Sequence, residues 1–304
     1  MQNIPARITT DWAFDRYEAI RPRLPKASYP KTSRHAAHLA DLAEHFDAFI
    51  LDAFGVLNRG DDPIPEAPDR MRQLREMGKK LIVLTNAASY TRADLLAKYH
   101  RLGFDFDTSE VVSSRDVALA NLPSLPDGKP WAAISLPNDD FSDSLLPLES
   151  LSQDPTLLQR AGGFLFLSNG ALGEEESARL TKALSDNPRP LVVANPDLVA
   201  PRASGLSLEP GAVAHEIADT LTISPSFFGK PFGDAFDVAI ARLQGVDRQR
   251  IAMVGDTLHT DILGGAAAGL GTVLITDHGL FQGCDTAPYI CRSGIRPDWI
   301  VPTT

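Results

Sequence analysis

The sequence predicts an α/β protein with a doubly wound parallel sheet and a smaller α/β unit inserted into it. Three observations support this prediction. Apolar runs of strand length alternate with segments of helical spacing. The runs at 49–51, 81–84 and 251–254 are continuously apolar, as in a sheet that is covered on both faces. Each of these runs ends on polar residues, and open α/β sheets bind ligands just beyond the carboxyl ends of their strands.

The first third of the chain sets up the alternation. Residues 10–20 suit a short helix, and the apolar spacing over 33–46 predicts a second one. After the strand at 49–51 we expect a helix over 66–77 that ends at Gly78, then the strand at 81–84. A helix over 92–102 and a short strand at 111–114 complete this part.

The middle third differs in character, and we interpret it as an inserted unit. Proline is frequent there, and strand-like runs recur at 131–136, 163–167 and 191–194, with helices expected at 155–161 and 174–186. The Asn195-Pro196-Asp197 sequence is a turn signal that is equally compatible with a plain turn and with a turn facing a ligand.

The last third resumes the first pattern and completes the domain prediction. It contains a helix at 236–243, a strand at 250–254, a small-residue helix at 262–269 and a strand at 272–276. We therefore expect an N-terminal extension (1–35), a core domain made of 36–115 and 227–304, and an inserted cap domain (116–226).

Composition excludes several classes of protein. The chain has 304 residues, 43% of them hydrophobic and 22% charged, which is typical of a globular protein. A net charge of −10 argues against non-specific binding to nucleic acid or to an anionic membrane. The two cysteines, Cys284 and Cys291, form neither a zinc motif nor a disulfide framework. Without an apolar signal core or spanning segment, we expect a cytoplasmic protein.

Four separated segments carry side chains suited to phosphoryl transfer. They are Asp52 after the first strand, Thr85-Asn86 after the second, Lys230 before a helix, and Asp256 with Asp261 after a later strand. A carboxylate can attack phosphorus while a hydroxyl and an ammonium bind the phosphoryl oxygens. The remaining carboxylates are the ligands that Mg²⁺ prefers. Taken singly, each residue also has a structural interpretation as a cap, a strand-end hydroxyl or a surface charge.

These four segments, in this order, resemble the motifs of the haloacid dehalogenase-like (HAD) superfamily of hydrolases. Subfamily IIA, the branch of the N-acetylglucosamine-phosphate, 4-nitrophenyl-phosphate and phosphoglycolate phosphatases, is similar at Gly-Val-Leu (55–57), Thr85-Asn86, Asn195-Pro196-Asp197, Gly229-Lys230-Pro231 and Gly255-Asp256-x₄-Asp261. That branch carries a large α/β cap between its second and third motifs, where we place the insertion. The resemblance covers roughly residues 46–290.

The resemblance implies a role for each matching residue. Asp52 would be the nucleophile and a ligand of Mg²⁺, together with Asp256, the main-chain carbonyl of Phe54 and a supporting Asp261. Thr85, Asn86 and Lys230 would bind the phosphoryl group, and Lys230 would also neutralise Asp52. The expected substrate is a small phosphorylated metabolite, with no nucleic acid or membrane partner, and a homodimer is plausible.

One position departs from the pattern. Phosphatases of this superfamily have a second Asp two residues after the nucleophile, which protonates the leaving oxygen and then activates water; here that residue is Phe54. General acid–base catalysis is typically worth about 10² to 10⁴ in rate. His259, Asp61 or Asp62 could substitute for it, although His259 favours a structural role.

Three functions remain compatible with the sequence. The first is a phosphatase that is slow on poor leaving groups, with an aspartyl-phosphate at Asp52. The second is a module that binds a phosphorylated ligand or a partner with little turnover. The third is a 2-haloacid dehalogenase, since Asp52-Ala53-Phe54-Gly55 resembles the Asp-Ala-Tyr-Gly of those enzymes. The position of the insertion and the intact metal-type loop argue against the third.

Overall fold

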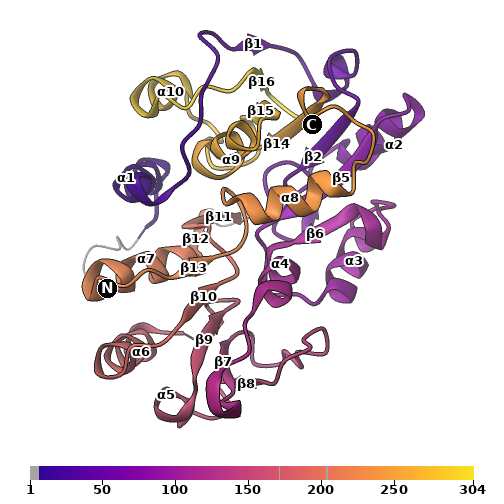
Figure 1. Ribbon diagram of the computed structural model, residues 1–304. Helices are drawn as coiled ribbons and strands as arrows, with labels where there is room; N and C mark the ends of the chain where they lie inside the picture. Colours follow the sequence, from indigo (N-terminus) through magenta and orange to yellow (C-terminus); the bar gives the residue numbers. More distant parts are fainter. Residues whose placement is uncertain (1–6, 171, 203–204) are drawn as a thin grey trace.

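The computed structural model describes residues 7–170, 172–202 and 205–304. Residues 1–6 of the predicted extension, and residues 171 and 203–204 of the predicted insertion, lie outside this set. Two parallel sheets organise the chain, one in the upper half and one in the lower half of Figure 1. No helix among the described residues is both long enough and apolar enough to cross a membrane.

The larger sheet has seven parallel strands in the order β1-β16-β15-β14-β2-β5-β6. Their bounds are β1 Arg34–His35, β2 Ala48–Leu51, β5 Lys80–Thr85, β6 Val111–Ser113, β14 Ile251–Gly255, β15 Gly271–Ile275 and β16 Trp299–Val301. Successive residues of β2 point to opposite faces, so Phe49 and Leu51 join one apolar cluster and Ile50 joins another. Both faces are therefore buried, which explains the continuously apolar strands.

Helices cover both faces of this sheet. Met71 of α2 (Ala67–Glu76) and Leu95 of α3 (Arg92–Arg101) pack on the face of Phe49. Val117 of α4 (Ser114–Asn121) and Phe236 of α8 (Gly233–Ala241) pack on the face of Ile50. The doubly wound α/β class predicted from the sequence is confirmed.

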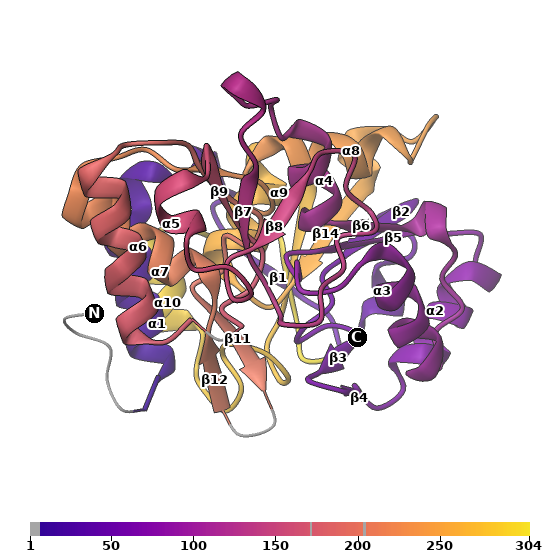
Figure 2. The same ribbon diagram turned by 90° about the horizontal axis from the view of Figure 1, so that it is seen from below.

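The smaller sheet has five parallel strands in the order β13-β10-β9-β7-β8. They are β7 Trp131–Ile134, β8 Leu148–Ser150, β9 Gly163–Phe166, β10 Leu191–Val193 and β13 Ser226–Phe227. Its helices are α5 Leu157–Arg160, α6 Glu174–Asp186 and α7 Pro210–Leu221. The antiparallel hairpin of β11 (Val199–Arg202) and β12 (Gly205–Leu208) lies where the two sheets meet (Figures 1 and 2).

The division into domains stays a prediction, and elements cross its boundaries. Strand β1 belongs to the larger sheet although residues 1–35 were assigned to the extension. Helix α4 spans position 116 and packs against α8, and β13 spans position 226. A second antiparallel pair, β3 (Asn58–Arg59) with β4 (Asp62–Pro63), follows β2.

The prediction of a helix over 33–46 is wrong. The segment instead contains β1 and a 3-10 turn, Leu39–Leu42. The backbone N–H groups of Arg34 and Ala36 donate to the carbonyls of Asp298 and Ile300, at 2.8 and 3.2 Å. Pairing with a strand from the far end of the chain thus overrides the local helical spacing.

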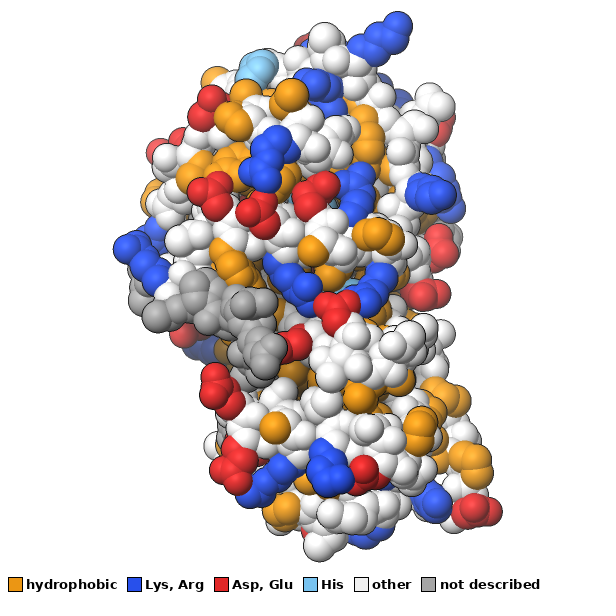
Figure 3. Space-filling view, turned by 90° about the vertical axis from the view of Figure 1, so that its left-hand side faces the viewer, with side chains coloured by type: hydrophobic (Ala, Val, Ile, Leu, Met, Phe, Trp, Pro, Cys, Tyr) orange, Lys and Arg blue, Asp and Glu red, His pale blue; other side chains and the backbone are white. Residues whose placement is uncertain are grey.

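Helix α1 (Thr10–Ile20) begins and ends at the predicted residues. It packs between α10 (Ala287–Ser293) and α7, at the left of Figure 1. Figure 3 shows positive and negative side chains interspersed on the face that these helices form. The expected helix at 262–269 starts earlier, as a π turn (Leu258–Ile262) followed by α9 (Leu263–Ala267).

Candidate active site

Three neighbouring strands of the larger sheet deliver polar side chains to one edge. Strand β2 is followed by Asp52, β5 ends on Thr85, and β14 is followed by Asp256. Because the strand order is β14-β2-β5 and all three are parallel, these side chains emerge side by side. The backbone N–H of Asp52 donates to the carbonyl of Val254 at 2.8 Å, which extends the pairing to the carboxylate itself.

Three carboxylates form a compact cluster at this edge. Asp52, Asp256 and Asp261 each offer an oxygen, and these oxygens all lie within 4.8 Å of one another. Asp256 and Asp261 are buried, whereas 13% of the Asp52 side chain is exposed. Asp52 is therefore the carboxylate of the cluster that a ligand from outside can reach.

Lys230 supplies the positive charge in the cluster. Its ammonium lies 2.5 Å from Oδ1 of Asp52 and 2.9 Å from Oδ1 of Asp261. The side chain is buried, and although burial opposes its charge, the carboxylates of Asp261 and Asp52 raise the pKa of Lys230. It therefore remains an ammonium at every physiological pH.

The single ammonium of Lys230 does not neutralise the three carboxylates of the cluster. Burial raises the pKa of Asp52 well above its usual range, opposed by Lys230 and reinforced by Asp261 and Asp256. Burial and Asp261 likewise raise the pKa of Asp256 to about 7. Such a cluster is costly to ionise without a further cation.

The surroundings of Asp256 and Asp261 position these acids for oxygen coordination. Asp256 accepts from the N–H of Leu280 at 2.7 Å and from the hydroxyl of Thr257 at 2.8 Å. The N–H of Thr257 donates to Asp261 at 3.1 Å. Oxygen donors of this kind suit Mg²⁺.

Two glycines leave the space that Asp256 occupies. A Cβ at Gly279 would lie 1.9 Å from Oδ2 of Asp256, and one at Gly55 would lie 2.7 Å from the same atom. Gly55 also has a φ of +79°, which side-chain-bearing residues rarely adopt. The turn after β2 and the loop after β15 can therefore approach Asp256 closely because each has a glycine, Gly55 or Gly279, at the point of approach.

Thr85 and Asn86 occupy the end of β5 in different ways. Thr85 is buried, and its hydroxyl accepts from the N–H of Ala87 at 3.1 Å. The Asn86 side chain accepts from the N–H of Lys230 at 2.8 Å and donates to Asp197 at 2.8 Å. The Asn86 side chain thus links the end of β5 to the segments of Lys230 and Asp197. Because its amide is used in these bonds, a substrate would contact the backbone of Asn86 rather than its side chain.

Phe54 stands where the resemblance leads one to expect an acid. The turn that carries it is closed by hydrogen bonds from Asn58 N–H to the carbonyl of Ala53 (3.0 Å) and from Gly55 N–H to the carbonyl of Asn58 (2.9 Å). The carbonyl of Phe54 takes no part in these bonds. The half-buried ring packs against the core and lies beneath two cations, Lys98 and Arg202.

The three suggested replacements for the acid lie in unfavourable settings. His259 is buried, its Nε2 lies 2.5 Å from a carboxylate oxygen of Glu18, and burial lowers its pKa. Rings of Phe14 and Tyr17 enclose it. Asp61 is almost fully exposed and pairs with Lys98, and Asp62 is exposed.

Two features near the site were not among the predicted site residues. Asp197, in the Asn-Pro-Asp turn, reaches Asn86, and burial raises its pKa to about 7 although Lys230 opposes the shift. Helix α1 bridges the two sheets: its Tyr17 hydroxyl accepts from the N–H of Leu198 at 3.1 Å, while Glu18 holds His259. Only the Asn-Pro-Asp turn had a sequence signal.

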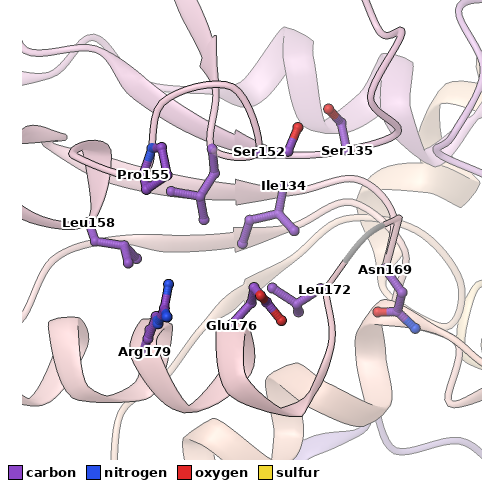
Figure 4. Close-up of a pocket in the computed structure, with 10 residues that line it drawn as sticks. Ile134, Ser135, Ser152, Pro155, Leu158, Asn169, Leu172, Glu176 and Arg179 are labelled. Carbon is purple, nitrogen blue, oxygen red and sulfur yellow. The ribbon is translucent and has the colours of Figure 1, made fainter.

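A cavity lies away from this cluster, in the smaller α/β unit. It measures about 210 Å³ and is lined by both apolar and polar side chains between β7, α5 and α6 (Figure 4). Its charged wall residues are Glu176 and Arg179, and none of the three clustered acids contributes to it. The chemistry of the carboxylate cluster is therefore separate from this cavity.

A parallel sheet whose strand ends gather three acids and a lysine is typical of an enzyme of phosphoryl chemistry. Comparison with known proteins supports that class. Residues 49–139 match the family model of haloacid dehalogenase-like hydrolases, and residues 227–303 match a second, HAD-hydrolase-like model. Human glycerol-3-phosphate phosphatase is 31% identical over 265 residues, covering 79% of this chain and 81% of the relative. The chain belongs to the haloacid dehalogenase-like hydrolase family.

Solved structures show the same fold. A possible sugar phosphatase of this superfamily from Cytophaga hutchinsonii superposes with a TM-score of 0.78 at 26% identity, covering 89% of this chain and 98% of that one. A glycerol phosphate phosphatase from Mycobacterium tuberculosis, in complex with magnesium, superposes with a TM-score of 0.64 at 23% identity. That alignment covers 85% of this chain and 75% of the neighbour.

Proposed function

We propose that this protein is a Mg²⁺-dependent phosphatase of a small phosphorylated metabolite, acting through an aspartyl-phosphate at Asp52. One observation carries the proposal: Asp52, Asp256, Asp261 and Lys230 converge at the carboxyl edge of the larger sheet. The relatives named phosphatases support the reaction type.

The chain's own residues divide the work. A carboxylate oxygen of Asp52 attacks phosphorus, an Asp52 O–P bond forms, and the bond from phosphorus to the substrate oxygen breaks. Lys230 and Thr85, with the backbone beside Asn86, hold the phosphoryl oxygens as charge shifts to the leaving oxygen. Water then attacks the aspartyl-phosphate, which releases inorganic phosphate and restores the Asp52 carboxylate.

The residues that would hold the metal are Asp52, Asp256 and Asp261, with the carbonyl of Phe54. They fit Mg²⁺ because they are oxygen donors, and because burial makes the ionised cluster costly without a cation. When bound, the ion supplies positive charge that lets two anions approach each other. The supporting bonds from Leu280 and Thr257 keep Asp256 and Asp261 in place.

Phe54 shapes the expected activity. It can neither donate a proton to the leaving oxygen nor activate water. Substrates whose leaving group is stable as an anion, such as aryl and acyl phosphates, lose least from this absence. The same observation supports the second candidate, a module that binds a phosphorylated ligand with little turnover.

Phosphate release from a panel of esters tests the proposal. We expect Mg²⁺-dependent turnover of 4-nitrophenyl phosphate that a chelator abolishes, and a phosphorylated Asp52 peptide in acid-quenched protein. Asp52→Asn should lower the rate at least about a thousandfold, whereas Asp69→Asn, at an exposed site on α2, should not change it. Binding of phosphorylated ligands without turnover would favour the binding module instead.

The remaining expectations about partners and place are proposals too. We propose a cytoplasmic protein, supported by two unpaired cysteines, Cys284 and Cys291. We also propose that it acts on small molecules rather than nucleic acid or membranes, consistent with its net charge of −10. A homodimer remains a prediction that light scattering would test.

A further inference from the structure

The ring of Phe54 is a meeting point of two cations that no proposed catalytic role uses. The ammonium of Lys98 lies 5.1 Å from the ring centroid, and the guanidinium of Arg202 lies 5.0 Å from it. Lys98 comes from α3 on the larger sheet, and Arg202 comes from β11 of the hairpin between the sheets. Two like charges from separate elements therefore converge two residues from Asp52.

The ammonium of Lys98 is largely buried, and burying a charge is energetically costly. Its side chain is only 7% exposed, so the ammonium is largely removed from water. Its ammonium donates to the carbonyl of Gly60 at 3.1 Å and lies 3.3 Å from the Asp61 carboxylate, whose side chain is 90% exposed. Because the Asp61 carboxylate is surrounded by water, its electrostatic attraction for the Lys98 ammonium is weak.

Arg202 is held in position but retains donors. Its Nε donates to the Ser207 hydroxyl at 3.0 Å and its Nη2 donates to Glu209 at 2.9 Å. Its Nη1 has no hydrogen-bond partner in the part of the chain that the structure describes. A guanidinium fixed on one edge can bind a carboxylate or phosphate with the other.

The position of Lys98 and Arg202 near Asp52 indicates which part of a substrate they would bind. In phosphoryl transfer the attacking oxygen and the leaving group lie roughly in line on opposite sides of phosphorus. The Lys230 side chain, which contacts Asp52, is 1% exposed, whereas the half-buried Phe54 follows Asp52 by two residues and has the Arg202 guanidinium over its ring. The organic part of the substrate would then run along the Phe54 ring, toward the two cations.

We propose that Lys98 and Arg202 bind a second anionic group on the leaving portion of the substrate, which is therefore a small phosphorylated acid rather than a neutral polyol phosphate. This inference rests on the phosphatase function proposed above. A Phe at position 54 is part of the arrangement, because its uncharged ring leaves both cations available to bind the anion.

Matched substrates test the proposal. 3-Phosphoglycerate and glycerol 3-phosphate differ only in a carboxylate that replaces a hydroxymethyl group, and glycerol 1,3-bisphosphate carries a second phosphate instead. We expect kcat/KM to favour 3-phosphoglycerate over glycerol 3-phosphate at least about tenfold, mainly through KM. The preference should shrink as salt is added. A stronger preference for the bisphosphate would identify the second anion as a phosphate.

Variants test whether Lys98 and Arg202 cause the preference for 3-phosphoglycerate over glycerol 3-phosphate. Arg202→Gln should reduce the substrate ratio at least about fivefold, and Lys98→Gln should do the same if it folds. Arg179→Gln, which removes an exposed arginine paired with Glu175 on α6, should leave the ratio unchanged. An equal kcat/KM for the two substrates in the wild-type protein, or an unchanged ratio in Arg202→Gln, would overturn the proposal.

Binding separates this inference from the proposed function. In the Asp52→Asn background, calorimetry should show that 3-phosphoglycerate binds at least about tenfold more tightly than glycerol 3-phosphate, and that Arg202→Gln removes the difference. Hydrolysis of 4-nitrophenyl phosphate without any such difference would reject the second-anion site alone. Failure of every ester to react or bind would reject both.

Discussion

The ammonium of Lys230 lies 2.5 Å from the carboxylate of Asp52, although the two residues belong to segments on either side of the smaller sheet in the sequence. The contact depends on β2 ending beside the loop before α8. It also depends on Asn86, which holds the backbone N–H of Lys230 at 2.8 Å. Charge balance at the site is therefore a property of the tertiary structure.

Removing this lysine should destabilise the protein in a pH-dependent way. In Lys230→Met, Asp52 and Asp261 lose their buried partner, which typically costs about 3–5 kcal/mol. The cost should shrink toward pH 5, because the unpaired acids then take up protons. Urea unfolding without divalent ions measures it. Lys182→Met, which removes an exposed lysine, should cost less than about 1 kcal/mol, and equal losses in the two variants would refute the prediction.

Restoring an acid at position 54 should change which substrates react. We expect Phe54→Asp to raise kcat for glycerol 3-phosphate about tenfold or more, toward the 10² to 10⁴ that acid–base catalysis contributes. Hydrolysis of 4-nitrophenyl phosphate should change little, because its leaving group needs no proton. Phe54→Asn is polar but cannot transfer a proton, so equal rates in the two variants would count against the explanation.

A single methyl group should displace Asp256. The added Cβ of Gly279→Ala would lie 1.9 Å from Oδ2 of Asp256, the atom that also accepts from Leu280. A shift of this size typically costs about a hundredfold in rate. The apparent affinity for Mg²⁺ in a metal titration should fall as well. Gly233→Ala has open space at its Cβ and serves as the control. Similar behaviour of both variants would show that the close approach of Gly279 to Asp256 is not required.

Asp197 should make stability fall as pH rises. Burial raises its pKa to about 7 in the folded protein, whereas an unfolded chain loses this proton near pH 4. Between these values the folded state binds more protons, so the free energy of unfolding decreases with pH, by up to about 4 kcal/mol from this group. Asp197→Asn keeps an acceptor for Asn86 and removes the titration. Urea unfolding at pH 5 and pH 8 should show a flatter dependence in the variant than in the wild type.

Buried and exposed contacts of α1 should differ in strength. Tyr17→Phe removes the acceptor of the buried Leu198 N–H, which should cost about 1–3 kcal/mol. Asp219→Ala removes ion pairs to Arg16 and Arg23 that are partly exposed to water, and should cost less than about 1 kcal/mol. Denaturant unfolding of both variants ranks the two contacts, and the reverse order would show that the ion pairs dominate.

Much of the fold follows from local pattern. Continuous apolar runs predicted the central strands because a sheet covered on both faces needs no polar alternation. Helices α1 and α6 begin and end where their spacing indicated. The 33–46 segment was missed because its partner, β16, lies near the other end of the chain, and local periodicity carries no information about such pairing.

The sequence by itself predicted which residues would carry the chemistry, because Asp52, Thr85, Lys230, Asp256 and Asp261 follow strands or precede a helix, and parallel strands share one edge. Only the tertiary structure decided their neighbours. It committed the Asn86 side chain to Lys230 and Asp197, and enclosed His259 against α1. It also brought Lys98 and Arg202 to the Phe54 ring. These contacts join distant segments, and they arise only when both sheets and the hairpin between them have packed.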